Sequence, residues 1–402
     1  MVQTLANIPN SQARRNELHH RLPSLNRAQR LQLLCLTLDD PFPPIRQDVA
    51  QALKDELQAS PGHNGALLRF LEATATGRAP AHDVTAALDI PRQSLAHDSE
   101  RARMAACVAL EGSTQPTETA DVIRPLLRAE SAHLRYQALI AVYRLVPGDR
   151  RLYDVVIEAM EDDDPEVAVV ATQIAVKNAW TDLLPNFLRA RARLEGEDRT
   201  QVTFSVGALI ENSAMTASDL PPEARTDMIA ECVDALTHEP HTAAASKTLA
   251  RLEATEAEGA LVDVTTKWFA HPILKVEAAA ALVELGSAEG PKHLQKALNS
   301  RRKDARGYAL RVVGTHRLPQ FFDHLVDVAT ADVYHADTAT LALADFGDER
   351  ARQVLSQIAD SHPQAEVRQL ASDALRRGLG DQSDEPLFGT AEPAQFDATV
   401  DR

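Results

Sequence analysis

A short apolar stripe recurs along this chain at a nearly constant interval, and it constrains the fold more than any other feature. In residues 360–377 the stripe consists of Val367, Ala371, Ala374 and Leu375, so the last three follow the first at offsets of four, seven and eight. At 100° per residue, these side chains fall within about 100° of one another on a helix. The pattern predicts a helix that begins after a proline turn and buries one narrow apolar face.

The same stripe fits nine further times, which defines a repeat. Successive first positions are separated by 57, 32, 33, 34, 41, 32, 31, 30 and 32 residues, so seven of the nine intervals lie between 30 and 34. Such a period indicates stacked helical units rather than separate globular domains. The fit is weakest in the units of Gln201 and Thr242. The ten first positions are Ile45, Ala102, Leu134, Val167, Gln201, Thr242, Leu274, Ala305, His335 and Val367.

The residue at offset four is small in nearly every unit. It is Ala in seven of the ten units and Ser, Ser and Val in the others. A small side chain lets a neighbouring helix approach closely, where a Leu would hold it away. We therefore expect this position to be buried against another helix. The residues are Val49, Ala106, Ala138, Ala171, Ser205, Ser246, Ala278, Ala309, Ala339 and Ala371.

Carrying Val-Arg-x-x-Ala-x-x-Ala-Leu on the second helix of a pair, the chain resembles the HEAT-like repeats of the phycobilisome-lyase type. The resemblance covers roughly residues 26–378. It implies an all-α fold, an α-α superhelix or solenoid of about ten or eleven armadillo-like helical hairpins. Such repeats serve as scaffolds, adaptors and a few enzymes, so the fold alone does not select a function.

The pattern divides the chain into three parts. Residues 1–25 form a polar N-terminal arm or cap, and residues 26–378 form the solenoid. The 57-residue interval predicts a degenerate or inserted repeat at about 58–96, with short helices near 64–74 and 81–88. Asn, Ser, Asp and Pro-Pro in residues 211–225 predict a loop that is a possible hinge.

Residues 379–402 lack the apolar rhythm. Six acidic residues against one arginine give this segment a net charge of −6 + 1 = −5. The composition predicts an acidic disordered tail. Phe388 and Phe396 are isolated aromatics that could anchor a short recognition motif, although we expect a plain solubilising tail.

Charge and cysteine content restrict the function. The formal net charge of −16 argues against nucleic acid as a partner. Cys35, Cys107 and Cys232 lie far apart in helical patterns, so they predict free thiols and neither a zinc site nor a disulfide. The N-terminus lacks the apolar core of a signal peptide and no window approaches 18 apolar residues, so we expect a cytoplasmic protein that does not enter the membrane.

Residues that would carry catalysis are missing from the sequence pattern. Di-iron hydroxylases of the HEAT-like class place His-Glu pairs on several repeats, whereas this chain has one pair, His238-Glu239. Phosphate-binding glycine loops and nucleophile or zinc-hydrolase signatures are also missing. The sequence predicts no catalytic residue, no metal and no cofactor. The alternative is an enzyme or enzyme subunit, chromophore-lyase-like or metal-dependent hydroxylase-like.

On each second helix, the side chains at offsets two, five and nine point away from the packed stripe. In proteins of this type, that side lines the concave surface. These side chains should be polar if they meet only water, yet in four successive units they are largely apolar. We expect a groove for a protein or peptide partner, unless the strip is covered by residues 60–96, by superhelical curvature or by a second copy of the chain. The candidate partner-binding residues are Met104, Tyr136, Leu139, Tyr143, Val169, Val176, Val206 and Ile210.

Offset one carries a basic residue in six of the ten units. This position lies at the margin of the packed face, which favours ion pairs with the acidic caps of neighbouring repeats. The sequence therefore predicts a structural ladder that joins consecutive repeats. Its members are Arg46, Arg103, Arg135, Lys275, Arg306 and Arg368.

Overall fold

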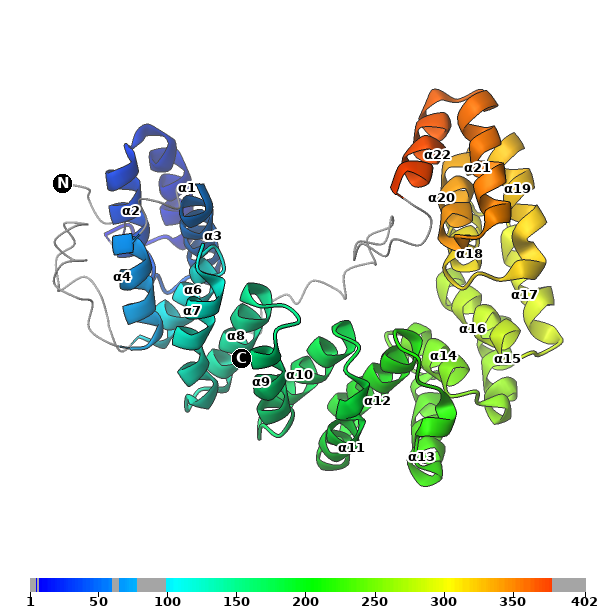
Figure 1. The fold of residues 1–402 in the computed structure, drawn as a ribbon, viewed down its shortest axis with the longest axis horizontal. Helices are drawn as coiled ribbons and strands as arrows, with labels where there is room; N and C mark the ends of the chain where they lie inside the picture. Colours follow the sequence, from blue (N-terminus) through cyan, green and yellow to red (C-terminus); the bar gives the residue numbers. More distant parts are fainter. Residues whose placement is uncertain (1–4, 6, 60–64, 78–98, 378–402) are drawn as a thin grey trace. The chain divides into compact units, whose positions relative to one another are not determined.

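The computed structural model describes residue 5 and residues 7–59, 65–77 and 99–377. Within these ranges all regular secondary structure is helical. The chain divides into two compact units, residues 1–215 and 216–402, which are described separately. Figure 1 shows helical hairpins that follow one another in chain order within each unit.

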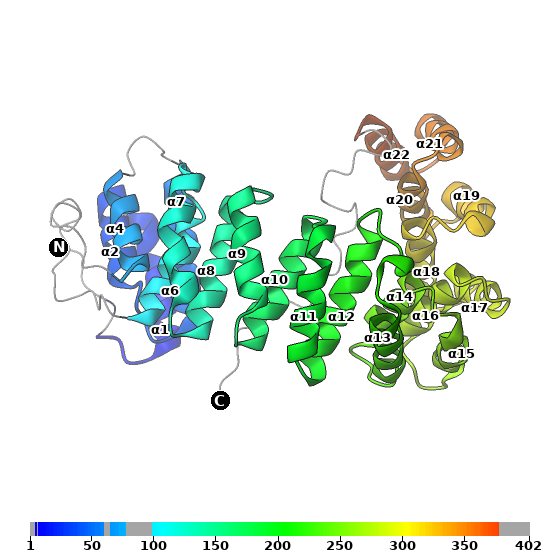
Figure 2. The same ribbon diagram turned by 60° about the horizontal axis from the view of Figure 1, so that its bottom comes forward.

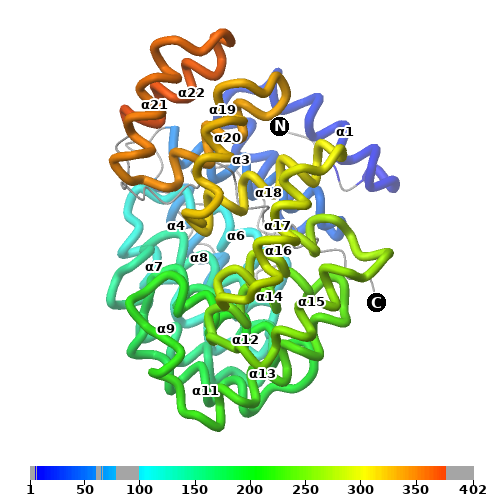
Figure 3. Tube along the Cα trace, turned by 90° about the vertical axis from the view of Figure 1, so that its right-hand side faces the viewer, coloured from blue at the N-terminus to red at the C-terminus, as the bar shows by residue number. Residues whose placement is uncertain are grey.

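The first unit contains a single leading helix and then five hairpins. In each hairpin a first helix is followed by a second helix, and the second helix carries the apolar stripe. Figure 3 shows the first helices α7, α9 and α11 following one another along one side. The helices are α1 (Ser11–Arg21), α2 (Arg27–Leu36), α3 (Pro43–Ala59), α4 (Gly65–Ala75), α6 (Glu100–Leu110), α7 (Pro116–Ile123), α8 (Ala132–Leu145), α9 (Arg150–Met160), α10 (Pro165–Lys177), α11 (Leu184–Arg193) and α12 (Gly196–Glu211).

The second unit continues with five hairpins of the same kind. Figure 2 shows two layers here, with α15, α17, α19 and α21 on one side and α16, α18, α20 and α22 beside them. The helices are α13 (Pro222–Ala235), α14 (Thr242–Arg251), α15 (Glu258–Thr266), α16 (Pro272–Glu284), α17 (Glu289–Leu298), α18 (Lys303–Thr315), α19 (Phe322–Ala331), α20 (Ala336–Phe346), α21 (Glu349–Ser361) and α22 (Ala365–Arg377).

The repeat template locates all ten second helices correctly. The offset-four residue is buried in every unit, and it is fully buried in nine of them, from Val49 to Ala371. Consecutive second helices within a unit pack directly on each other, for example α18 on α20. Their approach is close, because a Cβ built on Gly314 of α18 would lie 2.6 Å from the Cα atom of Ala342 in α20. The predicted burial of the offset-four residue is confirmed.

The 57-residue interval has a simple structural origin. The second helix α6 packs against both α4 and the preceding second helix α3. The ammonium of Lys54 in α3 lies 2.7 Å from the carboxylate of Glu111, just beyond the end of α6. Thus α4, near the predicted helix at 64–74, is the first helix of an ordinary hairpin. The extra residues lie between α4 and α6, and the expected helix at 81–88 lies outside the described residues.

The predicted arm at residues 1–25 contains helix α1. Its Arg14 is buried and donates through Nε and Nη2 to the two carboxylate oxygens of Asp40, at 2.9 and 3.0 Å. This ion pair ties α1 to the turn between α2 and α3. The division between the two units falls within the predicted loop 211–225, and its role as a hinge stays a prediction. The acidic segment 379–402 lies outside the described residues.

The basic ladder is present in part. Arg135 pairs with Asp162, and Arg306 lies 2.7 Å from Asp332, so each reaches the turn of the following hairpin. Arg46 donates instead to the carbonyl of Asp40, and Arg368 to the carbonyl of His362, both in the turn of their own hairpin. The basic side chain at offset one thus bonds either to the turn of the next hairpin or to the turn of its own hairpin.

Candidate binding surface

Two hairpin turns of the second unit expose apolar side chains to solvent, and the turn between them exposes basic ones. These turns connect α15 to α16, α17 to α18, and α19 to α20. We call residues 267–269, 299–303 and 332–334, which belong to these turns and include the first residue of α18, the turn surface. Among the described residues, the large hydrophobic side chains that lie exposed are all here: Trp268 at 84%, Phe269 at 90%, Val333 at 72% and Tyr334 at 68% exposure.

The first of these turns is held at both ends. Helix α15 ends where the backbone N–H of Lys267 donates to the carbonyl of Asp263 at 2.9 Å. Helix α16 begins with Pro272, and the His271 side chain accepts from the N–H of Ile273 at 3.4 Å. Because proline disfavours a helical residue before it, the chain must leave the helix here. Trp268 and Phe269 therefore stand on a short fixed connection and not on a helix face.

The third turn is joined to the second by a ring contact. The Lys303 ammonium lies 3.5 Å from the centroid of the Tyr334 ring, which is a cation–π contact. The N–H groups of Tyr334 and His335 donate to Oδ1 of Asp332 at 2.8 and 2.9 Å. Partial burial opposes ionisation of Asp332, but these N–H groups and Arg306 outweigh it and hold the pKa of its carboxyl below the ordinary value. Asp332 thus links this turn to Arg306 of α18 and to the start of α20.

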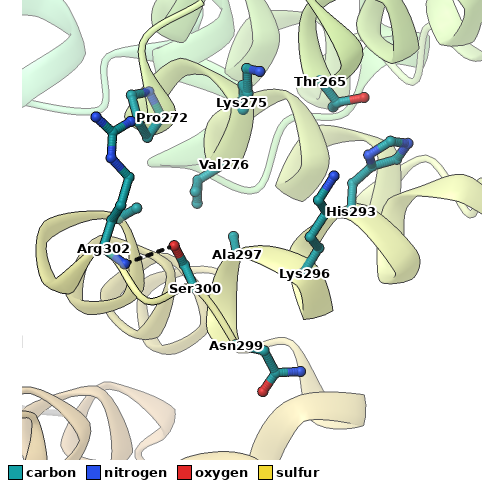
Figure 4. Close-up of a pocket in the computed structure, with 11 residues that line it drawn as sticks. Thr265, Pro272, Lys275, Val276, His293, Lys296, Ala297, Asn299, Ser300 and Arg302 are labelled. Carbon is teal, nitrogen blue, oxygen red and sulfur yellow. Dashed lines mark hydrogen bonds between the residues drawn. The ribbon is translucent and has the colours of Figure 1, made fainter. Parts of the chain in front are cut away.

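A pocket of about 450 Å³ lies beside the turn surface, between α15, α16, α17 and the start of α18. Figure 4 shows Arg302 and Pro272 on one side of the hollow and Lys296 and His293 on the other. Val276 and Ala297 lie between them and supply an apolar floor. A second hollow of about 370 Å³ shares Thr265, Lys275, His293 and Lys296 with this pocket and extends to Trp268.

This region is basic in an otherwise acidic chain. Residues 267–303 contain seven Lys and Arg against three Glu, a net charge of +7 − 3 = +4, whereas the whole chain carries −16. Five of the eight lysines of the sequence lie in this stretch: Lys267, Lys275, Lys292, Lys296 and Lys303.

Three cationic side chains that line the pocket have no counter-ion among the described residues. Within the described part of the chain, Lys275, Lys296 and Arg302 have no carboxylate oxygen within 4.0 Å. Lys292, on the same helix as Lys296, pairs with Glu289 at 2.7 Å. The pocket is therefore suited to an anionic ligand with an apolar part.

The strip predicted from offsets two, five and nine is largely covered. Leu139 and Val206 are fully buried, and Val169, Val176 and Ile210 are 7–8% exposed. The expectation that this side faces solvent is wrong for these five residues. Met104, Tyr136 and Tyr143 are half-buried.

The strip is buried because each second helix packs on the next one. Thr172, at offset five in α10, donates to the hydroxyl of Ser205, at offset four in α12, at 3.1 Å. The outward side of one helix therefore covers the stripe of its neighbour. Tyr143 is engaged in a similar way, since the Lys177 ammonium lies 5.9 Å from its ring centroid. Partner binding by the strip stays a prediction.

The partner-binding residues predicted from the sequence include no residue of the turn surface. The template describes second helices only, and the turn residues lie outside it. Two signals were nonetheless available: adjacent aromatics at Trp268 and Phe269 in a chain with 4% aromatics, and the local concentration of lysines.

Other kinds of site have less structural support. Across the ranges that the structure describes, no three His, Cys, Asp or Glu side chains gather as metal ligands would. His238 and Glu239 lie in the turn between α13 and α14. No described helix is long and apolar enough to span a membrane.

Comparison with known proteins supports the repeat assignment. A family model described as HEAT repeats matches residues 291–376, which include α18 to α21 and most of α17 and α22. No curated protein matches this chain. The phycobilisome-lyase subtype stays a prediction.

Two solved structures with similar folds are crystal structures of mutants of Kap121p, each 13% identical to this chain. The alignments cover 92% and 91% of this chain but 43% and 44% of those chains, with TM-scores of 0.42 and 0.40. This chain thus spans less than half the length of the solved chains. Residues 291–376 thus match HEAT repeats, and stacked helical hairpins of the same kind precede them along the chain.

Proposed function

We propose that this chain is a non-catalytic scaffold or adaptor that binds a protein partner, and that the turn surface is its main contact. The observation that carries the proposal is the pair Trp268 and Phe269, which are 84% and 90% exposed on a turn fixed at both ends. Contiguous exposed apolar surface usually marks an interaction site. Trp and Tyr are also enriched among the residues that dominate binding energy.

Magnitudes favour this pair over the strip in the first unit. Covering one exposed aromatic side chain removes about 150–250 Å² from water, which at about 25 cal/mol per Å² contributes about 4–6 kcal/mol before the costs of association. The strip residues Leu139 and Val206 are already buried and contribute nothing further. A contact on the concave side could still use the half-buried Met104, Tyr136 and Tyr143. Nothing among the described residues favours the enzyme alternative.

The test is a comparison of matched baits. The wild-type chain, a Trp268→Ala/Phe269→Ala variant and a Tyr143→Ala variant are used to capture partners from extracts of the native host, followed by identification by mass spectrometry. We expect one protein to be captured by the wild type and by Tyr143→Ala and lost with the double variant, while the melting temperature of the double variant is unchanged.

The reverse result contradicts the proposal. If the Tyr143→Ala bait loses the partner and the turn variant keeps it, the contact lies on the concave side as the sequence suggested. If all three baits keep it, neither surface is the main contact.

A further inference from the structure

The pocket beside the turn surface places like charges together, and no carboxylate of the described residues pairs with them. Lys275 comes from α16, Lys296 from α17 and Arg302 from the turn before α18, and all three line one hollow. By contrast, Lys54 and Arg144 both pair with the buried carboxylate of Glu111. Like charges around a low-dielectric floor repel one another and favour an anionic ligand.

The arrangement indicates the shape of that ligand. The cations stand on opposite sides of an apolar floor made by Val276 and Ala297 (Figure 4). A single small anion would meet one side only. A peptide with carboxylates on either side of an apolar side chain would meet both sides and cover the floor.

The chain contains one segment of this chemistry. Residues 379–402 carry a net charge of −5, and the stretch 384–392 places Asp384 and Glu385 before Phe388 and Glu392 after it. We propose that this acidic segment occupies the pocket, with Phe388 over the floor and the neighbouring carboxylates paired with Lys275, Lys296 and Arg302.

Chain length permits this contact. The segment follows α22, which ends at Arg377 in the same unit as the pocket. Residues 378–388 span up to about 36 Å when extended. Three steps of about 10 Å between packed second helices lead from α22 to α16. The pocket lies at the N-terminal ends of α16 and α18, whereas Arg377 ends α22, about 20 Å away along the helix axis. Residues 378–388 therefore span the distance when they are almost fully extended.

Trp268 reports on occupancy. It lines the hollow that shares Lys275 and Lys296 with the pocket. The only other tryptophan is Trp180, which packs against Tyr153 in the first unit. A Trp180→Phe background therefore leaves fluorescence from Trp268 alone.

The experiment titrates this single-tryptophan chain, truncated after residue 378, with a synthetic peptide of residues 379–402. We expect a saturable change in Trp268 fluorescence that is weakened about tenfold or more by Lys275→Glu/Lys296→Glu and by raising the salt concentration. The matched control is Lys292→Glu on the same helix, whose lysine is already paired; it should leave binding within about twofold. A peptide with Phe388→Ala should also bind more weakly. Thermal melts establish that each variant is folded.

Other occupants are separate outcomes. If the peptide does not bind, or binds equally well to the charge-reversed pocket, the proposal is overturned. If fluorescence of the untruncated chain depends on protein concentration, the segment comes from a second copy, and the intramolecular proposal is wrong. The titration needs no external partner, so failure to capture one would overturn the scaffold function without affecting this result.

Discussion

The guanidinium of Arg135 donates to both carboxylate oxygens of Asp162, which lies 27 residues further along the chain. Nε lies 2.8 Å from Oδ2 and Nη2 lies 2.6 Å from Oδ1. The remaining nitrogen, Nη1, donates to the carbonyls of Ala129 and Glu130 at 2.9 and 3.0 Å. Both side chains are mostly shielded, at 15% and 11% exposure. One side chain thus fixes its own hairpin turn and the next one.

Arg135→Lys should destabilise the first unit by about 1–2 kcal/mol, because an ammonium cannot reproduce this bidentate geometry. The matched control is Arg128→Lys, whose pair with Glu158 at 3.2 Å is largely exposed, and which should change stability by less than about 0.5 kcal/mol. Urea unfolding measures both. Equal effects of the two substitutions would show that the bidentate pair of Arg135 contributes no more stability than the exposed pair of Arg128.

Two glycines of α18 should respond in opposite ways to alanine. A Cβ on Gly314 would lie 2.6 Å from the backbone of Ala342, whereas a Cβ on Gly307 would lie 3.5 Å from the His335 ring. Gly314→Ala should therefore destabilise by about 1–3 kcal/mol through overpacking. Gly307→Ala should be neutral or stabilise by up to about 1 kcal/mol, because alanine favours the helix. Thermal melts of the two variants test this, and a destabilising Gly307→Ala would contradict the packing described.

Asp345 should make stability depend on pH. Burial raises the pKa of its carboxyl to about 6 from 3.8, although Arg317 and Arg311 oppose the shift. Because the folded pKa is raised, the favourable contribution is complete below pH 3.8 and is lost as the pH rises through 6.

Asp345→Asn should accordingly stabilise the protein at pH 7.5 by up to about 2 kcal/mol, a value reduced for partial exposure of this side chain. At pH 4 the effect should be close to zero. Urea midpoints at the two pH values measure the difference. A gain of the same size at both would mean that the carboxylate charge is not its cause.

The cysteines should be unreactive in the folded chain. Burial raises the pKa of the Cys35 and Cys107 thiols to about 12, and Cys232 is also buried. The reactive thiolate is therefore scarce at pH 8. A thiol reagent such as dithionitrobenzoate should label the protein slowly in buffer and rapidly in denaturant. Fast labelling of the native chain would indicate local opening near one of these helices.

The architecture could be predicted from the sequence because each second helix repeats the same requirement for a small residue at offset four. Ala138 and Ala309 are buried for the same reason in different units, so one pattern locates ten helices. The exposure of the outward side could not be predicted in this way. Whether Leu139 meets water or a neighbour depends on how far one helix is displaced along the next, and the pattern within a single helix does not contain that displacement.

The turn surface was missed for a different reason. Trp268 and Phe269 belong to no periodic pattern, and their significance follows from the closely placed ends of α15 and α16. Lys275 occupies the offset assigned to the structural ladder, yet no carboxylate in the described residues pairs with it. Only the three-dimensional positions of Lys296 and Arg302 around the same hollow reveal its different role.

The long connection between α4 and α6 shows where this architecture tolerates change. Extra residues at that hairpin turn leave α3, α4 and α6 packed as in an ordinary repeat. Insertions and new side chains at such turns therefore do not disturb the close packing that restricts residue size on the helices. Hairpin turns are the positions at which descendants of such a chain can acquire new specificities, one turn at a time, without redesigning the stack.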